Sequence, residues 1–329
     1  MPPSEQMPDP ASAPFGPADV RGRTALVTGA SDGIGFEIAR GLARSGARLL
    51  LPVRDRGKGG RAAARIRESA PGVRLELLDL DLARLDSVAA LVRTLRAAGE
   101  PIGFAVLNAG AVMLGERRRR TTPDGFELAF QTNFLGHAAL VLGILPLLRG
   151  DGRADGGGGL GGADHPGGAR VVVQGSLAAA GARLDWGDLQ GARRYGAYRA
   201  YRSSKLALGL FGAELARRSA AEGWGLSVQL CHPGIAPGSA IAPALRALLP
   251  AGLVGWASTR IGNPPEQAAQ TALAALSAPR SDPQRMFAPA GPFGIAGPPR
   301  ERAAFANLGR AGDARMLWEL ASRWAPILP

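Results

Sequence analysis

The chain has 329 residues, of which 46% are hydrophobic and 20% are charged, and this composition excludes an intrinsically disordered protein. Its single cysteine excludes a disulfide framework and a cysteine-based zinc site, and we expect no metal site. The net charge of +12 suits a polyanionic partner, but only Lys58 and Lys205 among the 39 basic residues are lysine, which indicates a general bias toward arginine. We therefore predict no nucleic-acid partner, although the run Arg117–Arg120 keeps that alternative open.

The first residues differ in composition from the rest of the chain. Residues 1–20 contain six prolines and three acidic residues but no basic residue, the reverse of a secretory signal, and they predict a disordered tail. The most apolar stretches, at 134–148 and 241–256, are too short or too interrupted for a membrane span. The sequence therefore predicts a cytoplasmic protein that does not insert into a membrane.

From residue 21 onward, short apolar runs alternate with helical periodicity, which predicts a mostly parallel α/β sheet with helices on both faces. In chain order we predict a strand at 24–28, a helix at 35–45, a strand at 47–53, a helix at 61–69, a strand at 73–80, a helix at 85–98, a strand at 104–107, a helix at 124–148, a strand at 170–173, a helix at 198–221 and a strand at 226–231.

Two stretches rich in glycine or proline interrupt this pattern. Residues 150–168 contain ten glycines in nineteen positions and predict a flexible surface loop. We expect the Pro- and Gly-rich stretch 279–300 to end the main fold, so that one domain spans 21–300 and residues 301–329 form a tail packed on its surface.

A glycine-rich turn joins the first predicted strand to the first predicted helix. Gly29 permits a tight turn, Gly33 allows a pyrophosphate to approach the backbone, and Gly35 lets the helix pack on the strand. The helix N-terminus adds free N–H donors and a partial positive charge. An ordinary turn is the alternative, but the strand–turn–helix context favours nucleotide binding. The candidate cofactor contacts here are Gly29, Ser31, Asp32, Gly33, Ile34 and Gly35.

The residues after the second predicted strand indicate which nicotinamide cofactor is used. An acidic residue there binds the ribose 2′-hydroxyl, whereas a basic residue accommodates a 2′-phosphate. Arg54 comes first after the strand, which favours NADP(H), and a register shift to Asp55 would favour NAD(H). At the end of the third strand, Asp81 is a candidate for the adenine amino group, with Leu82 beside it, and a solvated turn acid is the alternative.

Tyr201 and Lys205 lie four residues apart, on one face of a predicted helix. A neighbouring ammonium favours the phenolate, so we expect the pKa of Tyr201 to fall from about 10 toward the working pH. Such a tyrosine can donate a proton to a carbonyl oxygen or remove one from an alcohol. Chance spacing is the alternative, but one of only two lysines in the chain lies at this position.

Two further polar residues are candidates for the same site. Ser176 follows a predicted strand, at the carboxyl end where open α/β sheets bind their ligands, and Asn133 lies in the long predicted helix. Considered alone, Ser176 would be a turn serine and Asn133 a buried residue bonded to the backbone.

The whole set resembles the short-chain dehydrogenase/reductase superfamily. The matching residues follow the family's order over roughly residues 22–235 and are Thr28–Gly35, Asn108-Ala109-Gly110, Asn133, Ser176, Tyr201, Lys205 and Pro233-Gly234. Arg54-Asp55 with Lys58, the segments at 80–82 and 184–189, and the wide gap from Ser176 to Tyr201 are similar to the retinol-dehydrogenase and protochlorophyllide-reductase branch.

This resemblance implies one Rossmann-type, doubly wound domain of about seven parallel strands and a role for each matching residue. Tyr201 would be the general acid/base, Lys205 would bind the nicotinamide ribose and lower the pKa of Tyr201, and Ser176 would bind the substrate oxygen. Asn133 would hold a water in a proton relay. Asn108, Ala109 and Gly110 would line the cofactor, and Pro233 and Gly234 would lie near the nicotinamide. The helices at 124–148 and 198–221 are the family's usual dimer faces, so a homodimer is implied.

The residues after Pro233-Gly234 depart from the family pattern. The family often has a threonine four residues after this glycine, but Gly238 stands there. We expect residues 235–256 to form a mainly apolar substrate lid, which favours an apolar ketone, aldehyde or alcohol as substrate. The sequence thus predicts an NADP(H)-dependent oxidoreductase, with a non-catalytic NADP(H)-binding sensor as the alternative. His137 and His232 are expected to be structural.

Overall fold

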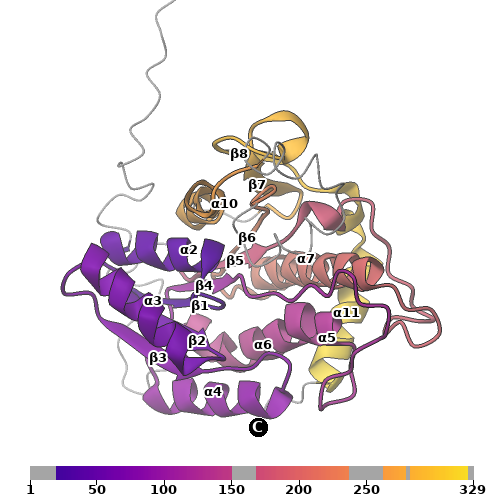
Figure 1. Cartoon of the computed structure of the whole chain (residues 1–329), viewed down its shortest axis with the longest axis horizontal. Coiled ribbons are helices and arrows are strands. Elements are labelled where there is room, and N and C mark those ends of the chain that lie inside the picture. Colours follow the sequence, from indigo (N-terminus) through magenta and orange to yellow (C-terminus); the bar gives the residue numbers. More distant parts are fainter. Residues whose placement is uncertain (1–19, 150–167, 237–261, 279–281, 325–329) are drawn as a thin grey trace, which may run out of the picture.

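A computed structural model describes residues 20–149, 168–236, 262–278 and 282–324, and these form a layered α/β fold (Figure 1). The central sheet of the described residues has eight strands in the order β3-β2-β1-β4-β5-β6-β7-β8. All neighbouring strands are parallel except β7 and β8, which are antiparallel. The strands are β1 (Thr24–Val27), β2 (Arg48–Val53), β3 (Leu75–Asp79), β4 (Phe104–Leu107), β5 (Arg170–Gln174), β6 (Ser227–Cys231), β7 (Arg285–Pro289) and β8 (Pro299–Ala303).

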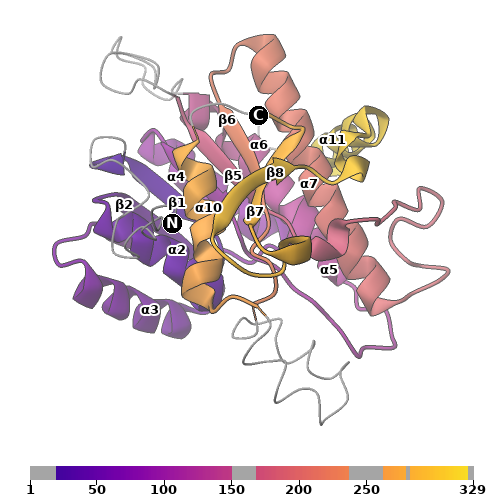
Figure 2. The ribbon, with the colours of Figure 1, turned by 90° about the horizontal axis from the view of Figure 1, so that it is seen from above.

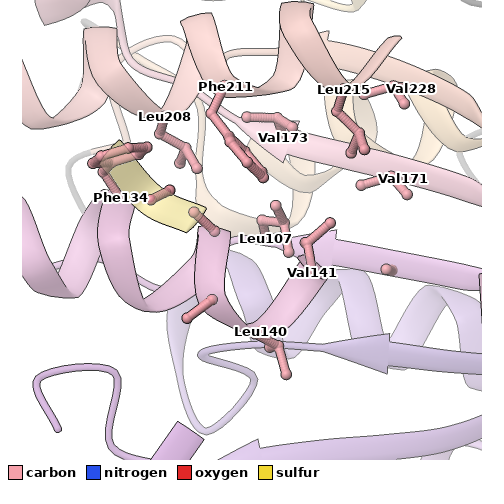
Figure 3. Close-up of a cluster of buried hydrophobic side chains, with 14 of the residues drawn as sticks. Leu107, Phe134, Leu140, Val141, Val171, Val173, Leu208, Phe211, Leu215 and Val228 are labelled. Carbon is pink, nitrogen blue, oxygen red and sulfur yellow. The ribbon is translucent and has the colours of Figure 1, made fainter. Parts of the chain in front are cut away.

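Helices cover both faces of the sheet, as Figures 1 and 2 show from two directions. Side chains alternate along each strand and supply two separate cores, so that Leu26 belongs to one cluster while Ala25 and Val27 belong to the other. The first core is drawn in Figure 3, where Val171, Val173, Phe134 and Phe211 meet between the sheet and its helices. One face carries α4 (Leu85–Ala98), α6 (Gly136–Arg149) and α7 (Ala197–Glu222), and the other carries α2 (Gly33–Arg44), α3 (Arg56–Ser69) and α10 (Pro265–Ser277).

The predicted fold class is confirmed, with one strand more than the resemblance implied. The first six strands lie within a few residues of their predicted bounds. Five of them are short apolar runs buried between the two helical layers, whereas β3 lies at the edge of the sheet and buries only Leu78. The strands β7 and β8 were not predicted, and they flank the Pro- and Gly-rich turn at 290–298. Polar residues dominate β8, which forms an edge of the sheet where charged side chains protect against further pairing.

The long helix predicted at 124–148 begins later and is irregular. Glu127 caps α5 (Leu128–Phe130) by accepting a hydrogen bond from the backbone N–H of Phe130 at 2.7 Å. A π-helical turn, η1 (Gln131–Leu135), then leads into α6. The combined helix Leu128–Arg149 is long and apolar enough to cross a membrane, but 78% of its apolar window is buried inside the molecule. Most of its apolar side chains are therefore part of the hydrophobic core.

The predicted end of the main fold at residue 300 is wrong. The strand β8 crosses that boundary, and α11 (Ala311–Trp324) packs on α7 and α6. Leu317 is fully buried, and the ring of Trp318 stacks on Phe211 with centroids 5.3 Å apart. Part of the surface that the resemblance assigns to a dimer is thus covered within the chain. The predicted tail at 1–20 and loop at 150–168 lie almost wholly outside the described residues.

We predict that replacing Trp318 by Ala lowers the free energy of unfolding by about 3 kcal/mol, because a large buried side chain is lost from the contact between α11 and α7. The change is measured by urea denaturation. Met316→Ala on the same helix is the matched control, since Met316 is 46% exposed and should cost at most about 0.5 kcal/mol. Equal stabilities of the two variants would contradict the assigned packing of α11.

Candidate active site

A cleft of about 680 Å³ lies at the carboxyl ends of the parallel strands. The strand order reverses beside β1, whose neighbours are β2 and β4, and such a switch point is where open α/β sheets bind their ligands. The cleft is lined by the residues that follow β1, β2, β3, β4, β5 and β6 and by the first turns of α7. It therefore brings together segments that lie far apart in the sequence.

The glycine-rich turn forms one wall of this cleft. Gly29 and Gly33 have φ values of +70° and +55°, which other residues rarely adopt. A Cβ atom at Gly35 would lie 2.3 Å from the carbonyl oxygen of Gly29, so only glycine fits there. The helix begins two residues earlier than predicted, at Gly33, and Asp32 caps it by accepting from the Gly33 N–H at 2.7 Å. All six predicted turn residues line the cleft.

The structure separates the roles of Arg54 and Asp55. Arg54 and Lys58 line the cleft beyond the end of β2. Asp55 is the N-cap of α3 and accepts a hydrogen bond from the backbone N–H of Lys58 at 2.9 Å. This hydrogen bond holds the pKa of Asp55 below its ordinary value. The side chains of Arg54 and Lys58 therefore give this end of the cleft a positive charge, which suits a 2′-phosphate.

The other predicted cofactor residues also line the cleft. Asp81 accepts from the backbone N–H of Ala83 at 3.0 Å, which leaves its second carboxylate oxygen available. The side chain of Asn108 donates to the backbone oxygen of Thr28 at 3.0 Å and so holds the glycine-rich turn against β4. The remaining cleft residues among the predicted set are Leu82, Ala109, Gly110, Pro233 and Gly234. Gly234 has a φ of +77° and would clash with Ile295 if it carried a Cβ atom.

Tyr201, Ser176 and Lys205 come together in the cleft. The hydroxyl of Tyr201 donates to Oγ of Ser176 at 3.2 Å, although the residues are 25 positions apart. The ammonium of Lys205 donates to the backbone oxygen of Gln174 at 3.0 Å. Tyr201 and Lys205 are 5% and 4% exposed, so both groups are removed from bulk water. Both lysines of this chain, Lys58 and Lys205, line this cleft.

The expected lowering of the pKa of Tyr201 is not found. Burial raises the pKa of Tyr201, and the hydrogen bond with Ser176 only partly opposes this. Burial also lowers the pKa of Lys205 to about 8. The phenol is therefore kept protonated, and the neighbouring ammonium is close to losing its proton.

Asn133 lies behind the cleft wall and does not line the cleft itself. Its side-chain oxygen accepts from the N–H of Ala111 at 2.6 Å, and its side-chain nitrogen donates to Oγ of Ser204 at 2.9 Å. A Cβ atom at Gly110 would be 3.3 Å from Oδ1 of Asn133 and 3.4 Å from Nζ of Lys205. Asn133 thus braces the loop that separates it from the cleft, and its predicted role with a relay water stays a prediction.

Several cleft residues were missed by sequence analysis. Leu177 and Ala178 follow Ser176, and Tyr198 precedes Tyr201 by one helical turn. Their proximity to the predicted catalytic residues was the available signal. Further cleft residues that were not predicted include Val112, Met113, Leu114, Thr132 and Gln174. Most of the expected lid at 235–256, with Gly238, lies outside the described residues, and the part of the chain that is described holds no cluster of potential metal ligands.

The arginine run lies in the loop after the apolar cleft residues. Arg119 donates to the backbone oxygen of Gln190 at 2.7 Å, and Arg120 contacts the sulfur of Met113. Two of the four arginines therefore have a structural role, which weakens the nucleic-acid interpretation of this run.

Comparison with known proteins agrees with this geometry. Residues 23–158 match the family model described as short chain dehydrogenase. Mouse polyprenol dehydrogenase is 39% identical over 65% of this chain and 60% of its own length, and mouse retinol dehydrogenase 12 is 35% identical over 66% and 62%. The aligned region therefore spans less than two thirds of these curated relatives.

Solved structures show the same fold. A putative uncharacterized protein from Mycobacterium paratuberculosis superposes with a TM-score of 0.71 at 28% identity, over 95% of this chain and 98% of that chain. The RhlG/NADP active-site complex from Pseudomonas aeruginosa has a TM-score of 0.60 at 25% identity, over 80% and 93%. The chain is therefore similar to the short-chain dehydrogenases and, among the curated proteins, to polyprenol and retinol dehydrogenases.

Proposed function

We propose that this chain is an NADP(H)-dependent oxidoreductase that interconverts an apolar alcohol and its aldehyde or ketone. The observation that carries the proposal is the hydrogen bond between the hydroxyls of Tyr201 and Ser176, in the same cleft as the glycine-rich turn. A phenol and a serine hydroxyl in this position can bind one substrate oxygen together.

The chain's own residues supply positioning and proton transfer. In the direction of reduction, Ser176 holds the substrate oxygen and Tyr201 donates its proton to that oxygen. The charge of Lys205 stabilises the phenolate that remains, and it is held in place by Gln174. The bound dinucleotide supplies the hydride chemistry. In oxidation the proton moves from the alcohol to Tyr201.

Positive charge beyond β2 supports NADP(H) over NAD(H). The side chains of Arg54 and Lys58 face the cleft, whereas the carboxylate of Asp55 is committed to capping α3. The absence of side chains at Gly29 and Gly35 lets the turn pack closely against Asn108 and Ala109, and the turn leads into the N-terminus of α2, where a pyrophosphate would be stabilised. The similar structure of RhlG from Pseudomonas aeruginosa is a complex with NADP, which agrees with this preference.

The apolar wall of the cleft supports an apolar substrate. Val112, Met113 and Leu114 lie on one side of the cleft, and Leu177 and Ala178 lie beside Ser176. The curated relatives are named polyprenol dehydrogenase and retinol dehydrogenase, and both names refer to long apolar alcohols. We therefore propose a long-chain isoprenoid alcohol or aldehyde as the substrate class.

Replacing Tyr201 by Phe removes the proton donor, so we expect kcat for reduction of apolar aldehydes to fall about 10²–10⁴-fold. NADPH oxidation with a panel of apolar carbonyls measures the change. Tyr195→Phe is the matched control, because Tyr195 lies outside the cleft, beside Glu127, and its loss should leave kcat unchanged. Equal turnover by Tyr201→Phe and the wild type would rule out the assigned role.

Replacing Arg54 by Ala should raise KM for NADPH about tenfold or more and leave KM for NADH nearly unchanged, because a charged contact to the 2′-phosphate is lost. Steady-state kinetics with both dinucleotides measure the preference. Asp55→Ala is the comparison variant, and we expect it to lower Tm without altering the NADPH to NADH ratio. A switch in preference caused by Asp55→Ala, with none from Arg54→Ala, would reverse the assignment.

The buried ammonium of Lys205 should set the alkaline limb of the reduction rate. Its pKa is about 8, so its charge is lost as pH rises through that value, while Tyr201 remains protonated because burial raises its pKa. We expect kcat/KM for reduction to be constant below about pH 7 and to fall about tenfold per unit above pH 8. Lys205→Arg should be slower but should lack this limb, since a guanidinium keeps its charge. A wild-type rate that stays constant to about pH 9.5 would contradict the assignment.

A further inference from the structure

His137 is a fully buried histidine in the first turn of α6, between the glycine-rich turn and the catalytic residues. Its Nε2 lies 2.9 Å from Oγ1 of Thr28, the residue that precedes Gly29. Its Nδ1 lies 3.0 Å from the backbone oxygen of Asn133, in the π-helical turn η1. One imidazole ring thus joins two walls of the cleft that come from β1 and from η1.

The partners fix the protonation of the ring. The backbone oxygen of Asn133 can only accept, so Nδ1 must carry a proton. Burial lowers the pKa of His137 to about 4, so the ring is neutral near pH 7 and Nε2 has no proton. Nε2 therefore accepts, and the hydroxyl of Thr28 is its donor.

The hydroxyl of Thr28 is fully used by this arrangement. It accepts from the backbone N–H of Asn108 at 3.0 Å and from that of Ala109 at 3.1 Å. Its one proton has two acceptors within reach, of which Nε2 of His137 at 2.9 Å is nearer than the backbone oxygen of Val106 at 3.2 Å, so the O–H and both lone pairs are occupied. The segment after β4, which lines the cleft, is thereby connected to the same histidine.

The hydrogen bonds continue from Asn133 to the catalytic tyrosine. The side-chain nitrogen of Asn133 donates to Oγ of Ser204 at 2.9 Å. Ser204 in turn donates to the backbone oxygen of Tyr201 at 2.8 Å. A continuous path therefore leads from Thr28 through His137, Asn133 and Ser204 to the backbone of Tyr201.

We propose that His137 is a positioning residue that fixes the glycine-rich turn and the π-helical turn η1 relative to each other. Cofactor binding and the placement of Tyr201 therefore depend on each other. The kinetic part of this inference rests on the proposed function. A buried imidazole is costly to desolvate, and an apolar side chain of similar size would fill the same space without that cost. The two hydrogen bonds to backbone and hydroxyl partners are what the imidazole adds to the core. π-Helical turns such as η1 also occur frequently at functional sites.

The protonation state of His137 can be measured in the wild-type protein. Long-range ¹H–¹⁵N NMR of ¹⁵N-histidine-labelled protein should show one neutral ring protonated on Nδ1, unchanged from about pH 5.5 to pH 8. His232 is an internal reference with the opposite tautomer, because its Nδ1 accepts from the N–H of Gly234 at 3.2 Å. The chain has three histidines, and the signal lost in His137→Phe identifies the ring. A His137 ring that is protonated on Nε2, or that titrates in this range, would overturn the proposal.

The coupling itself is tested by a double-mutant cycle of His137→Phe and Thr28→Val. We expect each single variant to lower kcat at least about tenfold and to raise the Kd of NADPH, measured by fluorescence titration. Because both changes cut the same path, the double variant should be no more than about threefold slower than the slower single variant. Full multiplication of the two effects, or a wild-type kcat and Kd in His137→Phe, would overturn the proposal.

Ser219→Ala controls for loss of stability alone. Ser219 is buried and bonds the backbone of Leu226, but it lies about 27 Å along α7 from Tyr201. The Ser219→Ala variant should have a lower Tm, while its kcat stays within about twofold of the wild type. If the wild type binds NADPH but reduces no carbonyl, the proposed function fails. The double-mutant cycle measured on the Kd of NADPH and the tautomer of the His137 ring still test the positioning role of His137.

Discussion

The hydrogen bond from Tyr201 to Ser176 joins two segments that only the folded sheet brings together. Ser176 follows β5 in the centre of the sheet, and Tyr201 lies in the second turn of α7. The neighbouring Arg202 fixes the relative position of the two segments, because its guanidinium donates to the backbone oxygens of Ala178 and Ala180. The distance between the two hydroxyls therefore depends on the crossover from β5 to α7 and on the packing of α7 against the core.

Burial gives this pair its chemical character. A phenol and an ammonium removed from water both favour their neutral forms, so Tyr201 is kept as a proton donor and Lys205 holds its charge only below about pH 8. An ammonium is compact enough to reach the backbone oxygen of Gln174 inside the fold, which a planar guanidinium would fit poorly. This explains why a chain that otherwise uses arginine has lysine at this position.

Much of the fold and the site could be predicted because their signals are local. The glycine-rich turn, the Tyr201–Lys205 spacing and the first six strands each depend on a few consecutive residues. The position of Arg54 after β2 could be predicted, whereas the cap that occupies the carboxylate of Asp55 is seen only in the folded structure. That cap depends on where α3 begins, which the weak periodicity of a glycine- and arginine-rich segment did not reveal.

What could not be predicted depends on tertiary packing. The π-helical turn at Asn133 places its side chain against Ala111 and Ser204, so Asn133 lies behind the cleft wall. The aromatic contacts of α11 with α7 connect residues about a hundred positions apart and have no local pattern. The pKa of Tyr201 follows from its burial, which spacing on a helix does not disclose.

The central claim is that this cleft transfers hydride between a dinucleotide and an apolar carbonyl carbon. The most direct measurement is mass spectrometry of the alcohols formed from a panel of apolar aldehydes and ketones, retinal among them, with NADPH deuterated at the transferable C4 position. The account predicts one deuterium on the carbinol carbon of at least one product with the wild type, and none above background with Tyr201→Phe. Consumption of the dinucleotide without label in any alcohol, or equal labelling by both proteins, would contradict it.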